Sequence, residues 1–312
     1  MAAGAVSQRH MTALPYLPAP ALRPLGDKTV SPLAWGMWRF RGDDLTAAQA
    51  RVEAAFAAGI TLFDTADIYG PDNGEAFGAA EALLGRVFKA APGLRDRMVL
   101  ASKGGIVIGT PYDSRAAYVA SAIDASLTRL ATDHIDLWQV HRPDILTHPA
   151  ELARALGDAV RAGKIGAVGV SNFSVAQIDA LARYLDVPLA STQPEFSPLC
   201  LTPIEDGQLD QAMASRLAVL AWSPLGGGRI AAPTTPREAA VAAALDEVAA
   251  AHGVSRTATA YSWIMAHPAG VIPIVGSQQP ERIAEAADAL KVRWTRADWY
   301  RVLVASRGVP LP

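Results

Sequence analysis

The stretch 59–70 combines a short apolar run with two side chains that can take part in proton transfer. The run 60–63 ends in the carboxylate of Asp64, and the phenol of Tyr69 follows five residues later. A phenol has a reference pKa of about 10, so an enzyme that uses one as an acid needs charges beside it. The segment predicts a buried strand that carries both side chains to the end of a sheet.

Polar side chains also follow the apolar residues of several other short runs. Each has an ordinary explanation when taken alone, such as a helix cap, a solvated loop residue or a packed and hydrogen-bonded residue. Their joint occurrence at run ends predicts that they meet on one face, because barrels of parallel strands carry their active sites there. These residues are Lys103, His141, Ser171, Asn172, Gln193, Trp222 and Ser223.

The apolar runs recur in alternation with helical patterns, which implies a parallel sheet. Helical patterns cover 47–58, 116–130, 152–162 and 175–184, and eight runs predict a (β/α)8 TIM barrel. The long interval before the last run predicts an inserted loop after strand 7, and 296–307 predicts an extra C-terminal helix. The runs end near Trp35, Asp64, Ser102, Val140, Val170, Gln193, Ala221 and Val275.

The predicted domain organisation is an irregular N-terminal leader over 1–25, followed by a single barrel domain over 26–312. The leader prediction rests on four prolines and the lack of a clear period. A doubly wound open sheet is the main alternative. It would usually bring a G-x-G-x-x-G fingerprint, which the sequence lacks.

The bulk properties exclude several classes of function. With 51% hydrophobic and 19% charged residues and a net charge of −2, the chain has no overall field that favours nucleic acid or an anionic membrane. It has no apolar run of membrane-spanning length and no secretory signal pattern. Its one cysteine, Cys200, forms no internal disulfide and no metal cluster. We therefore expect a cytoplasmic protein that binds no nucleic acid, membrane or metal.

In their order along the chain, these motifs resemble those of the aldo-keto reductases, from about Leu25 to Leu303. The resemblance is carried by FDTADIYG at 63–70, Ser102-Lys103, IDLWQVH at 135–141 and GKIGAVGVSNF at 163–173. It continues through QPEF at 193–196, WSPL at 222–225 and IPIVGS at 272–277 with Glu281 and Arg282. The turn at 226–229 is similar to that of bacterial members with little-defined substrate range.

The resemblance implies roles for four residues in the reduction of a carbonyl group. Tyr69 would be the general acid that protonates the carbonyl oxygen. Lys103 would favour the phenolate and so lower the pKa of the phenol, while Asp64 would hold Lys103 in place. His141 would donate a hydrogen bond that orients the carbonyl. Negative charge that develops on oxygen needs such donors and a proton.

The resemblance also implies a nicotinamide cofactor bound without a Rossmann domain. Gly276 stands where many NADP-binding relatives have Lys, and Ala286 where many have an adenine-contacting Asn, but Arg282 remains to bind a 2′-phosphate. NADP(H) is therefore preferred over NAD(H). The implied contacts are Ser171, Asn172 and Gln193 at the carboxamide, Trp222 on the ring (relatives more often have Tyr or Phe), Ser223, Leu225, Gly227, Gly228 and Arg229 along the pyrophosphate, and Gly276, Ser277 and Arg282 at the 2′-phosphate.

The predicted function is an NAD(P)H-dependent reduction of aldehydes or ketones to alcohols, with Met37, Trp38 and Trp138 as an aromatic and apolar pocket wall. One alternative is a nicotinamide-binding regulatory or sensor subunit with little catalysis. Another is a Schiff-base aldolase that uses Lys103. The sequence leaves the substrate, the direction of the reaction and the oligomeric state open.

Overall fold

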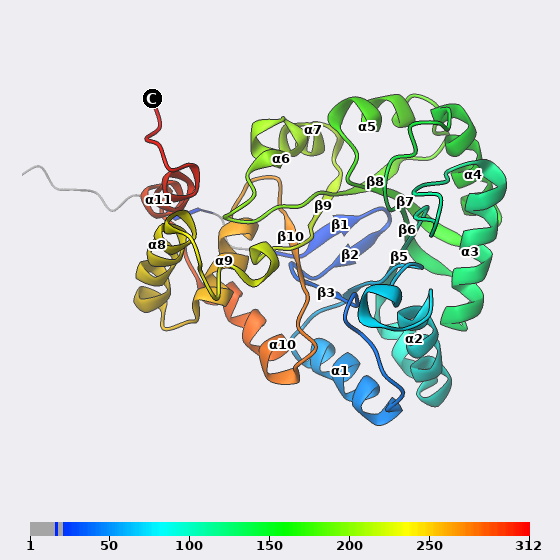
Figure 1. The fold of residues 1–312 in the computed structure, drawn as a ribbon, viewed down its shortest axis with the longest axis horizontal. Helices are drawn as coiled ribbons and strands as arrows, with labels where there is room; N and C mark the ends of the chain where they lie inside the picture. Colours follow the sequence, from blue (N-terminus) through cyan, green and yellow to red (C-terminus); the bar gives the residue numbers. More distant parts are fainter. Residues whose placement is uncertain (1–15, 18–20) are drawn as a thin grey trace, which may run out of the picture.

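The computed structural model describes residues 16–17 and 21–312, and within them eight parallel strands close into a barrel (Figure 1). The two ends of the ring meet where β10 pairs with both β3 and β9. This architecture confirms the predicted (β/α)8 barrel. Around the ring the strands are β10 (Ile272–Val275), β3 (Ala34–Gly36), β4 (Leu62–Asp64), β5 (Val99–Gly104), β6 (Ile135–Val140), β7 (Ile165–Ser171), β8 (Leu189–Gln193) and β9 (Ala218–Ala221).

Helices surround this ring, and several begin at side chains that satisfy free backbone N–H groups. Ser174 and Thr235 each form a reciprocal cap with the glutamine or glutamate three residues later. The α-helices are α1 (Leu45–Ala57), α2 (Ala79–Ala90), α3 (Ala116–Leu130), α4 (Pro149–Arg161), α5 (Val175–Ala182), α6 (Thr202–Glu205), α7 (Gln208–Ser215), α8 (Pro236–His252), α9 (Arg256–Met265), α10 (Pro280–Ala286) and α11 (Arg296–Arg307). Short 3-10 turns are η1 (Pro71–Asn73), η2 (Pro92–Arg97), η3 (Gly226–Gly228) and η4 (Ala287–Lys291).

Strand alternation decides which side chains reach the barrel interior. Leu62 and Leu137 belong to the apolar cluster inside the barrel, whereas Phe63 and Trp138 pack in the outer cluster beneath the helices. Asp64, two residues after Leu62, therefore faces inward at the carboxyl end of β4. Lys103 does the same in β5, two residues after the inward-facing Ala101.

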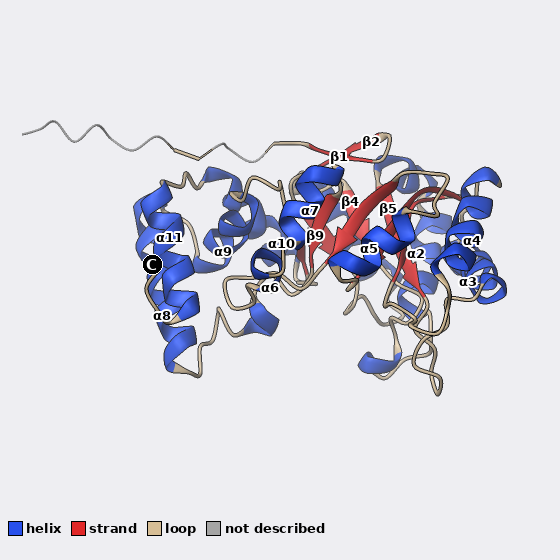
Figure 2. Cartoon of the chain, turned by 90° about the horizontal axis from the view of Figure 1, so that it is seen from above, coloured by secondary structure: helices blue, strands red, loops and turns tan. Residues whose placement is uncertain are grey.

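A β-hairpin closes the other end of the barrel and corrects the predicted leader. Strands β1 (Arg23–Leu25) and β2 (Lys28–Val30) pair antiparallel around a turn that holds Gly26 at φ 58°. Leu25 and Val30 are buried in the interior cluster, so the hairpin serves as the floor of the barrel (Figure 2). Residues 23–25 are thus ordered strand rather than irregular leader. The rest of the predicted leader lies outside the described residues, except for 16–17 and 21–22.

The segment between β9 and β10 contains the predicted insertion. The chain passes through η3 to Thr235, and then forms α8 and α9 before it returns to the barrel. The predicted C-terminal helix is α11, which packs beside α8 (Figures 1 and 2). Arg237 of α8 donates to the backbone oxygen of Ser306 in α11 at 2.5 Å. No helix in the described part of the chain is long and apolar enough to cross a membrane.

Candidate active site

A buried ion pair lies at the carboxyl end of the barrel. Lys103 Nζ donates to Asp64 Oδ2 at 2.6 Å and to the backbone oxygen of Thr65 at 2.9 Å, and the lysine is 0% exposed. Burial disfavours the charge of Lys103, but Asp64 and Tyr69 outweigh this effect, so the pKa of the lysine lies above its usual value. The result is a fixed ammonium group at the bottom of the site.

The second oxygen of the Asp64 carboxylate is held by two glutamines. Gln193 Nε2 donates to Asp64 Oδ1 at 3.0 Å, and Gln139 Nε2 approaches the same oxygen at 3.4 Å. Gln139 is held in turn by the hydroxyl of Ser191 at 3.3 Å. Gln139 was not among the predicted site residues. Its position two residues before His141, on the same side of β6, was the available signal.

The rings of Tyr69 and His141 stand together above the ion pair. Their centroids are 5.9 Å apart at an interplanar angle of 78°, and Lys103 Nζ lies 5.1 Å from the Tyr69 centroid. Loss of water raises the pKa of the Tyr69 phenol above 10, and Lys103 opposes this rise without cancelling it. The phenol therefore keeps its proton through the neutral range.

His141 is a neutral imidazole in this environment. Burial, followed by the charges of Lys103 and Arg142, places the pKa of His141 well below 6.5. Its Nδ1 has no hydrogen-bond partner within the described residues. The structure thus brings the four predicted catalytic residues together: an ammonium, its carboxylate, a protonated phenol and a neutral imidazole.

A chain of hydrogen bonds joins the predicted carboxamide-binding residues to the ring of Trp222. Trp222 Nε1 donates to Asn172 Oδ1 at 2.9 Å, and Asn172 Nδ2 donates to Ser171 Oγ at 2.9 Å. Ser171 Oγ donates to the backbone oxygen of Gln193 at 3.0 Å. Asn172 has φ 61°, an uncommon value for a residue other than glycine. This chain fixes the indole relative to Gln193, which also holds Asp64.

Comparison with known proteins places this site in a family. A profile of the Aldo/keto reductase family matches residues 32–303. The chain belongs to the aldo/keto reductases. Members use nicotinamide cofactors, so the protein is an oxidoreductase of this class.

Individual known proteins match this chain over nearly their whole length. A 6-dehydroglucose reductase of Novosphingobium aromaticivorans is 61% identical over 94% of this chain and 98% of its own. A 6-dehydroglucose reductase of Agrobacterium fabrum is 38% identical over 91% of this chain and 97% of its own. A crystal structure of an aldo/keto reductase from Klebsiella pneumoniae in complex with NADP and acetate superposes with a TM-score of 0.76, at 25% identity over 93% and 96% of the two chains.

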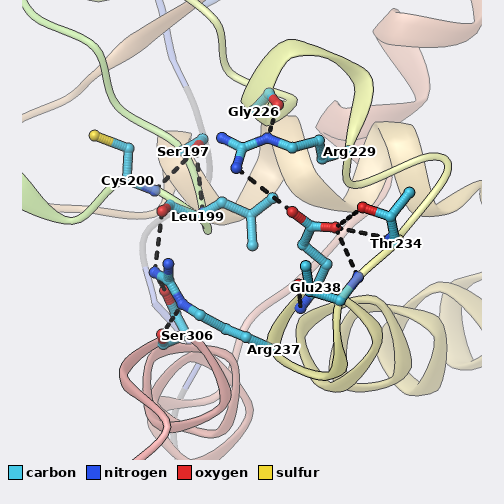
Figure 3. Close-up of polar contacts among 10 residues, drawn as sticks. Ser197, Leu199, Cys200, Gly226, Arg229, Thr234, Arg237, Glu238 and Ser306 are labelled. Atoms are coloured by element: carbon cyan, nitrogen blue, oxygen red, sulfur yellow. Dashed lines mark hydrogen bonds and ion pairs between the residues drawn. The ribbon is translucent and has the colours of Figure 1, made fainter.

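In the protein described here, one buried carboxylate, that of Glu238, holds the loop after β9 (Figure 3). Glu238 accepts hydrogen bonds from Thr234 N at 2.7 Å, Thr234 Oγ1 at 3.0 Å and Thr235 N at 3.1 Å, and it pairs with Arg229 at 3.4 Å. Arg229 Nε also donates to the backbone oxygen of Gly226 at 2.7 Å. The predicted pyrophosphate turn is therefore anchored through Arg229.

The predicted 2′-phosphate end is formed by the segment after β10. Ser277 accepts a hydrogen bond from Trp35 Nε1 on its backbone oxygen at 2.9 Å, and Arg282 is exposed on α10. Ala286 is fully buried on the same helix, so its side chain packs into the core.

Two of the three residues predicted for the substrate pocket are placed differently. Met37 and Trp138 are both 0% exposed and belong to the outer core cluster, because alternation turns Trp138 away from the barrel interior. Neither lines an open pocket wall. Trp38 is 42% exposed and donates to Asp72 at 3.3 Å, which ties it to η1 just after Tyr69.

A second buried acid, Asp67, lies behind the site and was not predicted. Its backbone N–H donates to the Lys103 oxygen at 2.9 Å, and its Oδ1 has no partner within the described residues. Burial and then the neighbouring Glu81 raise the pKa of Asp67 to about 8, although Arg129 and Lys103 oppose the rise. Asp67 is therefore an uncharged acid at neutral pH.

We expect this acid to make the folded protein less stable as the pH rises. The native state keeps a proton on Asp67 that the unfolded chain releases near pH 4, so the unfolding free energy falls between about pH 4 and 8, by about 1.4 kcal/mol per pH unit. Asp67→Asn should flatten this slope in urea unfolding curves recorded at several pH values. Asp43→Asn, an exposed control, should follow the wild-type slope. An unchanged slope in Asp67→Asn would contradict the assignment.

Proposed function

We propose that the protein reduces the aldehyde group of a hexose derivative such as 6-dehydroglucose, with NADPH as the hydride donor. The buried Lys103–Asp64 pair beneath Tyr69 carries this proposal, because it gives a phenol a fixed positive charge at the end of the barrel. The full-length similarity to the 6-dehydroglucose reductase of Novosphingobium aromaticivorans supports the substrate.

The proposed reaction is a proton transfer from Tyr69 coupled to hydride addition. A reduced nicotinamide, held by Ser171, Asn172 and Gln193 against the ring of Trp222, would supply the hydride to the carbonyl carbon. The electron pair of the carbonyl π bond moves to oxygen, and Tyr69 Oη gives its proton to that oxygen. Lys103 stabilises the phenolate that Tyr69 becomes, and the neutral His141 orients the carbonyl oxygen with a hydrogen bond.

The residues present are suited to a nicotinamide dinucleotide. Gly227 and Gly228 have φ 69° and 96°, and no atom lies within 4 Å of the position that a Cβ would take at either one. A phosphate group can therefore approach this backbone closely. Trp222 has an indole ring fixed by Asn172, and indole rings provide a flat surface for another ring.

A Schiff-base reaction at Lys103 fits the site poorly. An amine must lose its proton to attack a carbonyl. The ammonium of Lys103 is instead bound to Asp64 and its pKa is raised. The aldolase alternative is therefore disfavoured.

Arg39 is the residue that we propose as the missing cation at the 2′-phosphate. Its Nη1 lies 3.8 Å from the position that a Cβ would take at Gly276, where many relatives have Lys. The guanidinium stacks 4.4 Å from the centroid of the Trp38 ring and is exposed, with no carboxylate partner in the described part of the chain. Arg39 and Arg282 would together favour NADP(H) over NAD(H).

Replacement of Arg39 by Met should raise the KM for NADPH by about 10-fold and leave the KM for NADH nearly unchanged, because a charge-assisted phosphate contact contributes about 1.5 kcal/mol or more. Steady-state kinetics with both cofactors and one aldehyde would measure this. Arg183→Met, an exposed change at the end of α5, is the control. Equal KM increases for the two cofactors would rule out a contact with the 2′-phosphate.

The test of the proposed function is turnover by the purified protein, followed as loss of NADPH absorbance. We expect faster oxidation of NADPH with 6-dehydroglucose than with simple aliphatic aldehydes, and glucose as the product. Tight cofactor binding without turnover of 6-dehydroglucose or of a broad panel of aldehydes and ketones would favour a nicotinamide-binding sensor subunit instead.

A further inference from the structure

Arg142 is a charged, half-buried residue that the proposed chemistry does not use. It directly follows His141 at the end of β6, and its guanidinium carbon lies 5.9 Å from the centroid of the Trp222 ring. The positive charge of Arg142 acts on the imidazole of His141 and helps to lower its pKa. The side chain therefore borders the space between the catalytic imidazole and the proposed nicotinamide-stacking indole.

No hydrogen bond or ion pair satisfies this guanidinium within residues 16–17 and 21–312. Three other half-buried arginines contact carboxylates: Arg95 reaches Asp136 at 2.9 Å, Arg129 reaches Glu81 at 2.7 Å and Arg256 reaches Asp246 at 2.5 Å. Arg51, also half-buried, donates to the backbone oxygen of Arg41 at 3.4 Å. Arg23, which also lacks a carboxylate partner, lies at the opposite end of the barrel in β1. Partial burial of a charge costs free energy unless it is paired, so an unpaired arginine at the catalytic end suggests a ligand.

The nearest acid along the chain is used to fix the loop instead of to neutralise Arg142. The carboxylate of Asp144 accepts hydrogen bonds from Ser114 N at 3.0 Å, Leu146 N at 3.0 Å and Thr147 Oγ1 at 2.6 Å. These bonds hold the segment that carries Arg142 and occupy both oxygens of Asp144. The loop is ordered and the guanidinium remains available.

We propose that Arg142 recognises oxygen substituents on the carbons beside the carbonyl group of the substrate. The guanidinium presents N–H groups in a planar fork that can span two oxygens, such as adjacent hydroxyls or an anionic group. His141 would orient the carbonyl oxygen, and the guanidinium of Arg142 lies 5.9 Å from the centroid of the Trp222 ring, so it can reach substituents beside that carbonyl. This inference rests on the proposed reductase function, and it makes polyhydroxylated or acidic aldehydes the preferred substrate class.

The test compares three aldehydes in the Arg142→Met variant with NADPH: glyceraldehyde, glyceraldehyde 3-phosphate and propanal. We expect kcat/KM to fall about 10- to 100-fold for the first two and to change little for propanal, since only they offer oxygens to the fork. A larger loss for the phosphate ester assigns Arg142 to an anionic group, and an equal loss assigns it to the hydroxyls. Arg154→Met, an exposed change on α4, should leave all three values unchanged.

Other outcomes would overturn the proposal. An equal loss for all three aldehydes would make Arg142 a structural residue, and no loss for any would make it a bystander. NADPH affinity, measured by quenching of tryptophan fluorescence, should be the same in Arg142→Met as in the wild type. Failure of the wild-type protein to reduce any of the three, together with failure to reduce 6-dehydroglucose, would refute the reductase function itself. Wild-type turnover with an unaffected variant would refute only the role of Arg142.

Discussion

Tyr69→Phe should lower kcat for aldehyde reduction by about 100- to 10,000-fold, the usual contribution of a positioned general acid. The phenylalanine ring can keep the edge contact with His141 but has no proton to give to the carbonyl oxygen. Because Tyr69 lies on the substrate side of the ion pair, the dissociation constant for NADPH should change little. Steady-state kinetics and fluorescence titration with NADPH would separate the two effects.

Tyr300→Phe is the matched control for this prediction. Tyr300 is 42% exposed on α11, and loss of its hydroxyl should leave kcat unchanged. Wild-type kcat in Tyr69→Phe would overturn the assignment of Tyr69 as the acid. A parallel loss of NADPH affinity would instead indicate that the phenol helps to bind the cofactor.

Lys103→Met should reduce both turnover and stability. Turnover falls because nothing remains to stabilise the phenolate that Tyr69 becomes after it gives up its proton. Stability should fall by about 3–5 kcal/mol, because the variant leaves Asp64 buried without its cation. Urea unfolding at neutral pH and kcat measurements test the two parts.

Two further variants sharpen this prediction. The double change Asp64→Asn with Lys103→Met removes both charges, so it should recover part of the stability and none of the activity. Lys164→Met breaks an exposed pair with Asp124 and should cost less than about 1 kcal/mol. If Lys103→Met unfolds at the same urea concentration as the wild type, the buried pair does not stabilise the fold as inferred.

The ends of the apolar runs were predictable from the sequence because they obey local rules. Asp64 closes a short buried strand, and the alternation from Leu62 already turns its side chain toward the barrel interior. The same rule should have excluded Trp138, since it lies one residue from the inward-facing Leu137. The prediction for Trp138 weighted residue type above position. Met37 was assigned to the pocket only because it precedes Trp38 in the sequence.

Contacts between segments that are far apart in the chain could not be predicted from the sequence. Nothing near Gly276 indicates that Arg39, more than 230 residues earlier, occupies the adjacent space. The unpaired state of Arg142 depends equally on how Asp144 folds back onto Ser114. The β1–β2 hairpin was missed because its two strands have three residues each and lie next to a proline-rich stretch.

The pairing of β3 with β10 has a consequence for how the chain is made. The hydrogen bond from Trp35 to Ser277 joins residues 242 positions apart, so the ring cannot close until synthesis has passed Ser277. Until then both edges of the growing sheet lack neighbours, and exposed edges invite pairing with other chains. Closure of so long a loop is slow relative to local contacts. One edge of β3 therefore stays unpaired until β10 has been synthesised. During this time the nascent protein is most prone to aggregation.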